Sequence, residues 1–489
     1  MILLSIDPHI VHKTEAHYVF DVLLNILGYP YRRIPAGDES VRERQPRLHY
    51  GPDSSRPAGD GFLIHICAFE KAGPRIRRLK RSAVREDLPA GVLSLYTGEQ
   101  PGDGQVWYTD EISGAPLITS SGSRLLCNAD LVRTVFDFVT LAGERRIERR
   151  DPYGRFLRRY SPEGVEFYGQ AAVDRIAQLL RVFIEHAGAP PALDPWPESR
   201  RFALVLTHDV DRIRTWTWRK VRRARQAGTP AAVLLRSLLA PSNWCGNFSH
   251  ITKMENDLGG CSSFFFSAAH RVRRDPGYSP RSIRVQRGMA EIFQRGGSVG
   301  LHGSIPSAVD GAMLAGERMA LQRLCGSTVR SGRQHYLRFE GDRSWIALEA
   351  SGLQYDSTLG FADEPGYRCG TSYPFHPYDS RTSTPHRFWE IPLILMDTVL
   401  FLESKLSLRA ERAWELVLSY LQEARSNRGC LTVNWHNSNV SVLDGTGYSD
   451  LYQRMLRWAA EHGGWLCSLE QCGFWWSARE EKLKSLQSV

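Results

Sequence analysis

The sequence predicts an α/β protein with two unequal domains, and three observations lead to this prediction. Its 489 residues are more than one ordinary domain holds. Beyond residue 200, short apolar runs alternate with helical segments, which is typical of a parallel barrel or a doubly wound sheet. A proline-rich stretch at residues 187–199 separates that part of the chain from a shorter N-terminal part.

The N-terminal part, residues 1–145, is expected to be a small α/β domain. Strand-like apolar runs in it cover residues 1–6, 61–68 and 92–96. Helical spacing of apolar residues covers 16–27 and 131–141, and Gly28 is a typical stop signal for the first of these helices. No group of chemically reactive side chains stands out here, so the sequence assigns this domain no role.

Residues 146–199 are expected to form a connecting helix and a linker. An amphipathic pattern over residues 170–186 predicts the helix, and the proline-rich stretch follows it. The second domain is then expected over residues 200–480. Its expected strands cover residues 202–206, 262–266, 299–301 and 431–435, and its expected helices cover 282–295, 409–425 and 450–462.

The composition excludes several classes of protein. The formal charge of +9 comes from dispersed arginines with clusters at residues 75–85 and 145–159. Because no helix-turn-helix, zinc-finger or RNP motif accompanies them, a solvated surface explains these arginines better than a nucleic-acid partner does. The nine cysteines include no C-x-x-C pair, which favours reduced thiols over disulfide bonds or a thiolate zinc site. The apolar runs are too short for a transmembrane helix and residues 1–13 lack a signal-peptide pattern, so a cytoplasmic location is expected.

Ligand-capable polar residues follow several of the expected strands. These residues are Asp209, Asp211, His302, His335 and His436. Because the C-terminal ends of the strands in a parallel barrel converge on one face, residues far apart in sequence are expected to share one pocket. Aspartate together with imidazoles is a suitable ligand set for zinc or a similar divalent ion.

Each of these residues also has an ordinary structural interpretation. The pair Asp209 and Asp211 could cap a helix or close a turn, and a lone histidine is more often a hydrogen-bonded structural residue. The position of the two carboxylates directly after an apolar strand strengthens the chemical interpretation. In it, one carboxylate binds a divalent cation and the other takes a proton from an activated water molecule. A further histidine with a pKa near neutrality suits protonation of a leaving amine.

Seven segments of the second domain form an ordered set of motifs: THDVD, GLHGS, RQHYLRF, YDSTLGF, GYRCGTSYPF, EIPLILMDT and TVNWHN. In this order they resemble polysaccharide deacetylases (NodB-homology proteins similar to carbohydrate esterase family 4). The resemblance covers about residues 201–475 and is closest to a subgroup with an extra N-terminal domain. It implies a deformed (β/α)7-type barrel and a divalent metal, expected to be zinc, held by one aspartate and two histidines.

Taken residue by residue, the resemblance implies four catalytic groups. Asp209 matches the base, Arg333 the arginine that orients the base, and His436 the late acid. The backbone N–H of Tyr336 matches the donor to the oxyanion. Beside these, Arg338 and Trp435 are the expected substrate-binding residues. Asp356 and Asp397 could support the site, although capping or turn roles are the more ordinary interpretation of both.

The metal ligands depart from the family pattern at one position. Asp211 and His302 match the metal aspartate and the first metal histidine. The second metal histidine usually lies four residues after the first, where this chain has Pro306. Since proline cannot bind a metal, His335 is the best substitute, ahead of Ser304, His208 or a water molecule.

The resemblance implies a metal-dependent hydrolase that removes an N-acetyl or other acyl group from an amino sugar in a glycan or glycan precursor. Exopolysaccharide or cell-envelope glycan metabolism would suit such an enzyme. Two alternatives stay open. Pro306 favours a barrel that has lost its metal and serves as a glycan-binding or scaffold protein. The same scaffold could also hydrolyse another C–N bond in a small amide, because fold does not fix the substrate.

Overall fold

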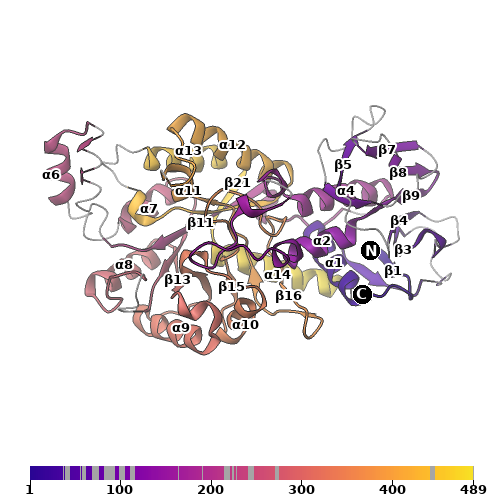
Figure 1. Ribbon diagram of the computed structural model, residues 1–489, viewed down its shortest axis with the longest axis horizontal. Helices are drawn as coiled ribbons and strands as arrows, with labels where there is room; N and C mark the ends of the chain where they lie inside the picture. Colours follow the sequence, from indigo (N-terminus) through magenta and orange to yellow (C-terminus); the bar gives the residue numbers. More distant parts are fainter. Residues whose placement is uncertain are drawn as a thin grey trace.

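The computed structural model contains two main β-sheets, one in each part of the chain, with helices packed around them (Figure 1). The structure describes residues 1–36, 38, 45–55, 57, 62–68, 76–81, 94–97, 105–110, 116–162, 165–189, 191–213, 221–222, 225–226, 228–239, 247–269, 275–402, 404–440 and 447–487. Of the arginine cluster at residues 75–85, residues 75 and 82–85 lie outside these ranges.

The N-terminal sheet is mixed. Its strands β1 to β4 and β9 form parallel pairs, whereas β5 to β8 form antiparallel pairs at the other end of the sheet. In spatial order its strands are β10 (Ala129–Asp130), β6 (Ser94–Thr97), β5 (Ile76–Arg81), β7 (Gln105–Asp110), β8 (Pro116–Ser121), β9 (Arg124–Cys127), β4 (Leu63–Cys67), β3 (Arg47–Gly51), β1 (Ile2–Ile6) and β2 (Tyr31–Arg33). The helices of this part are α1 (Lys13–Leu27), α2 (Leu131–Val139), α3 (Ala142–Arg145) and α4 (Ala172–His186).

The C-terminal sheet is parallel throughout. In spatial order its strands are β18 (Trp389–Glu390), β15 (Tyr355–Asp356), β14 (Ser331–Gln334), β13 (Ser298–Gly303), β12 (Ser263–Phe266), β11 (Phe202–Val210), β20 (Cys430–Asn434) and β19 (Leu395–Met396). A further strand, β21 (Gly464–Ser468), pairs with the first half of β11. Residues of β11 are buried along its whole length, as expected for a parallel strand that is covered on both faces.

One extended segment, residues 389–396, closes this sheet into a barrel. Its first half, β18, pairs with β15, and its second half, β19, pairs with β20 at the opposite end of the sheet. Between the two halves, the Leu393 N–H donates to the Leu359 carbonyl and the Ile394 N–H to the Thr432 carbonyl. The ring therefore consists of six strands and this shared segment, which confirms the expected (β/α)7-type barrel.

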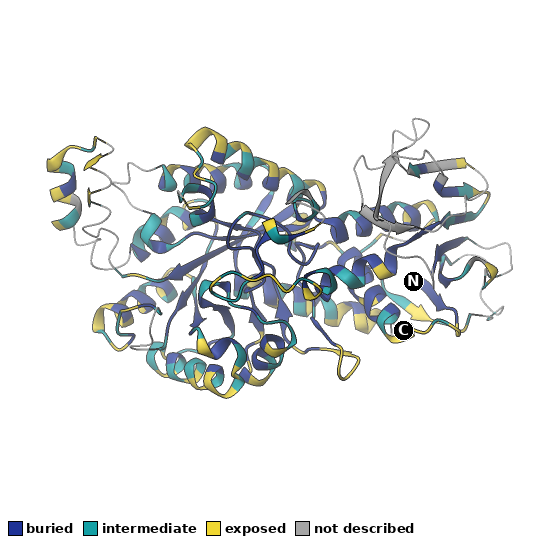
Figure 2. Cartoon of the chain, in the orientation of Figure 1, coloured by how far each residue is buried: buried dark blue, intermediate teal, exposed yellow. Residues whose placement is uncertain are grey.

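Helices cover the outside of the barrel, so that the strands are buried and the outer helix faces are exposed (Figure 2). These helices are α7 (Phe248–Asn256), α8 (Ile283–Gln294), α9 (Gly311–Cys325), α10 (Asp342–Ser351), α11 (Asp397–Phe401), α12 (Ala410–Ser426), α13 (Tyr448–Glu461) and α14 (Leu469–Gln487). Helix α6 (Ala231–Leu239) lies apart from them (Figure 1). A hairpin of β16 (Tyr378–Asp379) and β17 (Thr384–Pro385) precedes β18. No helix among the described residues is long and apolar enough to cross a membrane.

The two parts of the chain are packed together rather than tethered. Helix α14 runs from the barrel to the N-terminal sheet, so both chain ends lie close together there (Figure 1). On this helix, Arg479 donates to backbone carbonyls of Asn25 and Leu193. In the proline-rich stretch expected to be a linker, Trp196 is fully buried and packs against the rings of Tyr373 and Trp476. One continuous apolar core therefore contains residues from both sheets, while domain boundaries at residues 145 and 200 stay a prediction.

Candidate active site

The polar residues that follow the expected strands gather at the C-terminal end of the barrel. Asp209 is the penultimate residue of β11, and Asp211 follows the strand directly. His302 lies on β13, His335 follows β14, and His436 lies two residues after β20. Because β13, β12, β11 and β20 are successive neighbours and β14 lies beside β13, these strand ends form one edge of the barrel.

Asp209 is held at both carboxylate oxygens. Its Oδ1 accepts from Arg333 Nη1 at 3.0 Å, and its Oδ2 accepts from Asn434 Nδ2 at 2.7 Å. Arg333 is fully buried, and its other N–H groups donate to Thr207 and Ser357. Burial would raise the pKa of Asp209, but Arg333, followed by the two nearby histidines, brings it below its usual value. The carboxylate is therefore ionised at neutral pH and fixed in orientation.

Asp211, His302 and His335 form a group that could hold a cation. Asp211 Oδ1 lies 3.3 Å from His302 Nε2 and 3.6 Å from His335 Nε2, and one ligand atom from each residue lies within 4.8 Å of the others. Burial would raise the pKa of Asp211, but His302, His436 and His335 hold it far below its usual value. In turn, Asp209 and Asp211 outweigh burial and raise the pKa of His302.

The donor atoms of this group fit a divalent metal. Asp211 Oδ1 and His302 Nε2 are both sealed from solvent and make no hydrogen bond. Buried polar atoms that make no hydrogen bond are costly, so the approach of these two atoms to 3.3 Å points to an ion between them. The far nitrogens of both imidazoles are already engaged: His302 Nδ1 contacts the Arg333 carbonyl at 3.0 Å, and His335 Nδ1 contacts Asp275 Oδ1 at 2.7 Å. Such contacts leave Nε2 free to bind a metal in each case.

Of the side chains that the sequence offered as a third metal ligand, His335 lies in this group with Asp211 and His302. Pro306, at the position of the usual second histidine, begins a short helical turn, Pro306–Val309. The Ser304 hydroxyl donates to Glu317. His208 points out of the group, with Nε2 on Glu255 at 2.8 Å and Nδ1 on the Trp435 carbonyl at 2.5 Å.

His436 lies on the other side of Asp211. Its Nε2 is 3.7 Å from Asp211 Oδ2, and its Nδ1 lies 2.7 Å from Asp397 Oδ1. Burial lowers the pKa of His436, but Asp397, followed by Asp211 and Asp209, raises it to about 9. Asp397 also accepts from the backbone N–H groups of His436 and Thr398. The carboxylate therefore supports the imidazole as well as the start of α11, whereas a capping or turn role was the more ordinary expectation.

The structure places the remaining predicted residues less centrally. The Tyr336 ring lies 4.2 Å from the His335 ring, centroid to centroid, at the edge of the group. Arg338 pairs with Glu340 at 2.7 Å. Trp435 is fully buried against Tyr452, and its expected contact with substrate stays a prediction.

Two residues of the site were not singled out from the sequence. Asn434 lies inside the TVNWHN segment, so its position two residues before the predicted acid could have drawn attention to it. Asp275 follows no apolar run, and its side chain is only 1% exposed. It also accepts from the Ile305 N–H, which links it to the turn after His302. Nothing in the local pattern around Asp275 signals this role.

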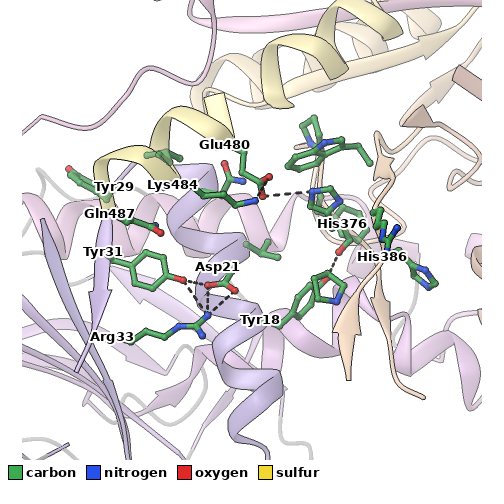
Figure 3. A pocket seen from close by; sticks show the side chains of 18 of the residues that line it. Tyr18, Asp21, Tyr29, Tyr31, Arg33, His376, His386, Glu480, Lys484 and Gln487 are labelled. Atoms are coloured by element: carbon green, nitrogen blue, oxygen red, sulfur yellow. Dashed lines mark hydrogen bonds and ion pairs between the residues drawn. The ribbon is translucent and has the colours of Figure 1, made fainter. Parts of the chain in front are cut away.

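A separate cavity of about 830 Å³ lies away from these residues. Helix α1, strand β2, residues 374–389 and the end of α14 line it (Figure 3). Its walls pair their charges internally, with Asp21 against Arg33 and Glu480 against His376 and Lys484 (Figure 3). Trp389, which lines the cavity, is the first residue of β18, so the cavity lies at the N-terminal ends of the barrel strands. None of the predicted catalytic or metal residues lines it.

Sequence and structure comparisons differ in what they find. No family model matches the sequence, and no curated protein matches it either. The structure is similar to a putative polysaccharide deacetylase from Mycobacterium smegmatis, at 17% identity over 60% of this chain and 96% of that one, with a TM-score of 0.40. It is similar to Puue allantoinase at 14% identity over 60% and 95% of the two chains, with a TM-score of 0.41. It is also similar to the carbohydrate deacetylase Agd3 at 8% identity over 98% and 87%, with a TM-score of 0.37. At these identities, the three likenesses concern the fold alone.

Proposed function

We propose that this chain is a metal-dependent hydrolase that removes an N-acetyl or other N-acyl group from an amino sugar in a glycan or glycan precursor. One observation carries the proposal. The Asp211 carboxylate faces His302 and His335 with one oxygen and His436 with the other, and Asp209 lies 4.0 Å from His302. A candidate metal site thus lies between a candidate base and a candidate acid.

Asp211, His302 and His335 would hold the metal, which we propose to be zinc because one carboxylate and two imidazoles are a typical zinc ligand set. When bound, such a cation polarises an acyl carbonyl and lowers the pKa of a water molecule towards about 7. Asp275 would keep the His335 ring in the orientation that presents Nε2 to this site.

Asp209 and His436 are suited to opposite proton transfers. Asp209 is ionised at neutral pH and can take the proton from the attacking water, while Arg333 and Asn434 fix its orientation. Asp397 favours the protonated form of His436, whose pKa is about 9 in the metal-free protein, and this form can donate to the departing nitrogen as the C–N bond breaks. Groups whose pKa values are shifted apart in this way are typical of acid and base partners. The backbone N–H of Tyr336 is proposed to donate to the oxyanion.

The first test is the metal content of the purified protein. We expect about one zinc per chain in the wild type and substantially less in Asp211→Ala, His302→Ala and His335→Ala. His462→Ala is the matched control, because that imidazole contacts the Trp458 carbonyl at the end of α13. A wild type that binds no divalent metal even after reconstitution contradicts the proposal.

The second test is product release. With metal bound, the wild type should release acetate and free amines from N-acetylated amino-sugar oligomers, and Asp209→Asn should abolish this release. Turnover of small amides instead of amino sugars would support the proposed hydrolase activity but contradict the proposed substrate class. Metal binding without turnover of either class would leave a binding protein. A cytoplasmic location stays a prediction, and it would bring the enzyme a glycan precursor rather than a finished external polymer.

A further inference from the structure

Residues 151–155, which come before the barrel in sequence, reach its candidate active site. Their turn is closed by Asp151, whose Oδ1 accepts from the backbone N–H groups of Tyr153 and Arg155 at 2.9 Å each. Asp151 Oδ2 accepts from Arg155 Nε at 2.9 Å and from Nη2 at 2.7 Å. Both side chains are largely buried, at 6% and 15% exposure. The arginine is therefore fixed before it meets the barrel.

The remaining guanidinium nitrogen of Arg155 contacts the barrel next to a proposed metal ligand. Its Nη1 donates to the backbone carbonyl of Tyr336 at 3.0 Å. The ring of Tyr153 stacks on the ring of Tyr336, with centroids 4.6 Å apart and planes 15° from parallel. Tyr336 directly follows His335, and their rings are in contact. The turn at residues 151–155 thus holds both the backbone and the side chain of Tyr336.

The backbone at this point needs external support. Tyr336 and Leu337 have φ values of 62° and 54°, in the left-handed region that side chains other than glycine rarely adopt. Each such residue costs on the order of 1 kcal/mol or more and persists only where its surroundings hold it. Arg155 supplies a charge-assisted hydrogen bond to the carbonyl between these two residues. Without it, the strained turn that directs His335 is free to relax.

We infer that Arg155 is a positioning residue for the metal site: through the Tyr336 carbonyl it fixes the turn that presents the His335 imidazole and the Tyr336 N–H to the pocket. The inference rests on the proposed function, since it concerns the same site. It gives the segment between the two sheets a part in the chemistry of the barrel. Asp275 holds the His335 ring from the other side, so the ligand is fixed at both its ring and its backbone.

The test is the zinc affinity of Arg155→Ala, measured by competition with a chelating dye on metal-free protein. Loss of a group that supports a metal ligand typically weakens binding by about 10-fold or more, and we expect a rise in Kd of that order. Charge alone predicts the opposite change, a fall in the Kd for zinc, because removing a nearby positive charge favours a bound cation. The direction of the change therefore separates positioning from charge.

Two further variants complete the experiment. Arg155→Lys keeps the charge, but an ammonium group cannot hold Asp151 through two N–H groups and still reach the Tyr336 carbonyl, so we expect it to weaken zinc binding as well. If Arg155→Ala does not fold, Arg155→Lys alone still tests whether Arg155 positions the metal site. Arg149→Ala is the matched control, since Arg149 lies in the same segment over the ring of Tyr160.

With an N-acetylated amino-sugar oligomer as substrate, we expect kcat to fall by about 10-fold in both Arg155 variants, with little change in KM, at saturating zinc and an unchanged melting temperature. Zinc affinity and kcat equal to those of Arg149→Ala, or tighter zinc binding, would overturn the inference. A wild type that binds no zinc would instead overturn the proposed function and, with it, the inference. The wild-type measurement comes first, so the two failures are distinguishable.

Discussion

At the scale of single residues, the contact between His436 and Asp397 fixes a protonation state. Asp397 is fully buried and lies 2.7 Å from the imidazole. Because the pKa of His436 is raised to about 9 from an ordinary 6.5, its protonated form is favoured by folding. This contribution to stability is fully present below about pH 6.5 and is lost as the pH rises through about 9.

Replacing the carboxylate should reverse that shift. In Asp397→Asn, burial is no longer outweighed by its strongest opposing group, so the pKa of His436 should fall from about 9 towards its ordinary value or below. The measurement is an NMR titration of the metal-free protein with labelled histidine rings. Asp310→Asn, which alters the cap of α9, is the control and should leave the titration unchanged. The same titration curve for His436 in Asp397→Asn would show that the carboxylate does not control the proton.

Residues of the site could be predicted to the extent that they lie on or directly after strands. Asp209, Asp211 and His302 follow from the pattern of apolar runs, because parallel strand ends meet at one edge. Asp275 could not be found this way, since it approaches His335 from a connecting loop. For Trp435, the sequence could not show that the ring is completely buried, because an aromatic residue after a strand can face inward or outward.

At the scale of elements, helix spacing was well predicted and the short strands were not. The helices expected at residues 170–186 and 282–295 correspond to α4 and α8 within two residues at each end. By contrast, β15, β18 and β19 are two residues long. Periodicity carries no signal over two residues, so the closure of the barrel by residues 389–396 depends on tertiary contacts.

Two glycines in helices differ in the space around them, so replacing each with alanine should have opposite effects on stability. A Cβ at Gly473 of α14 would lie 2.3 Å from Cδ1 of Tyr355, whereas a Cβ at Gly316 of α9 would meet nothing within 4 Å. Alanine is favoured over glycine in a helix by about 1 kcal/mol, so Gly316→Ala should raise the free energy of unfolding by up to that amount. Gly473→Ala should lower it by about 1–3 kcal/mol, because the helix must move off β15.

Urea denaturation of both glycine variants checks this pair. A stabilised Gly473→Ala would mean that α14 can shift away from Tyr355 at no cost. A lower free energy of unfolding in Gly316→Ala would mean that the space beside Gly316 on α9 is not open.

At the scale of the whole molecule, a buried ion pair joins the N-terminal part to the barrel. Arg368 Nε and Nη2 donate to the two carboxylate oxygens of Glu144 at 2.8 and 2.6 Å. Their side chains are 1% and 6% exposed. Arg368 also donates to the Gly360 carbonyl within the barrel, whereas Glu144 lies in the N-terminal part. Either partner alone would be left as an unpaired charge in an apolar surrounding.

A double-mutant cycle measures this coupling. Arg368→Met and Glu144→Leu should each lower the free energy of unfolding by about 3–5 kcal/mol, because each leaves the other residue as a buried charge without its ion-pair partner. The double variant should lose much less than the sum, since no unpaired charge remains. Arg145→Ala is the control: its pair with Asp342 is about one-third exposed on both sides and should contribute no more than about 1 kcal/mol.

Because both sheets share one apolar core, each variant should still unfold in a single transition, followed by tryptophan fluorescence in urea. Additive losses in the double variant would mean that the charges are not coupled across the interface, and two separate transitions would mean that the barrel is stable without the N-terminal part.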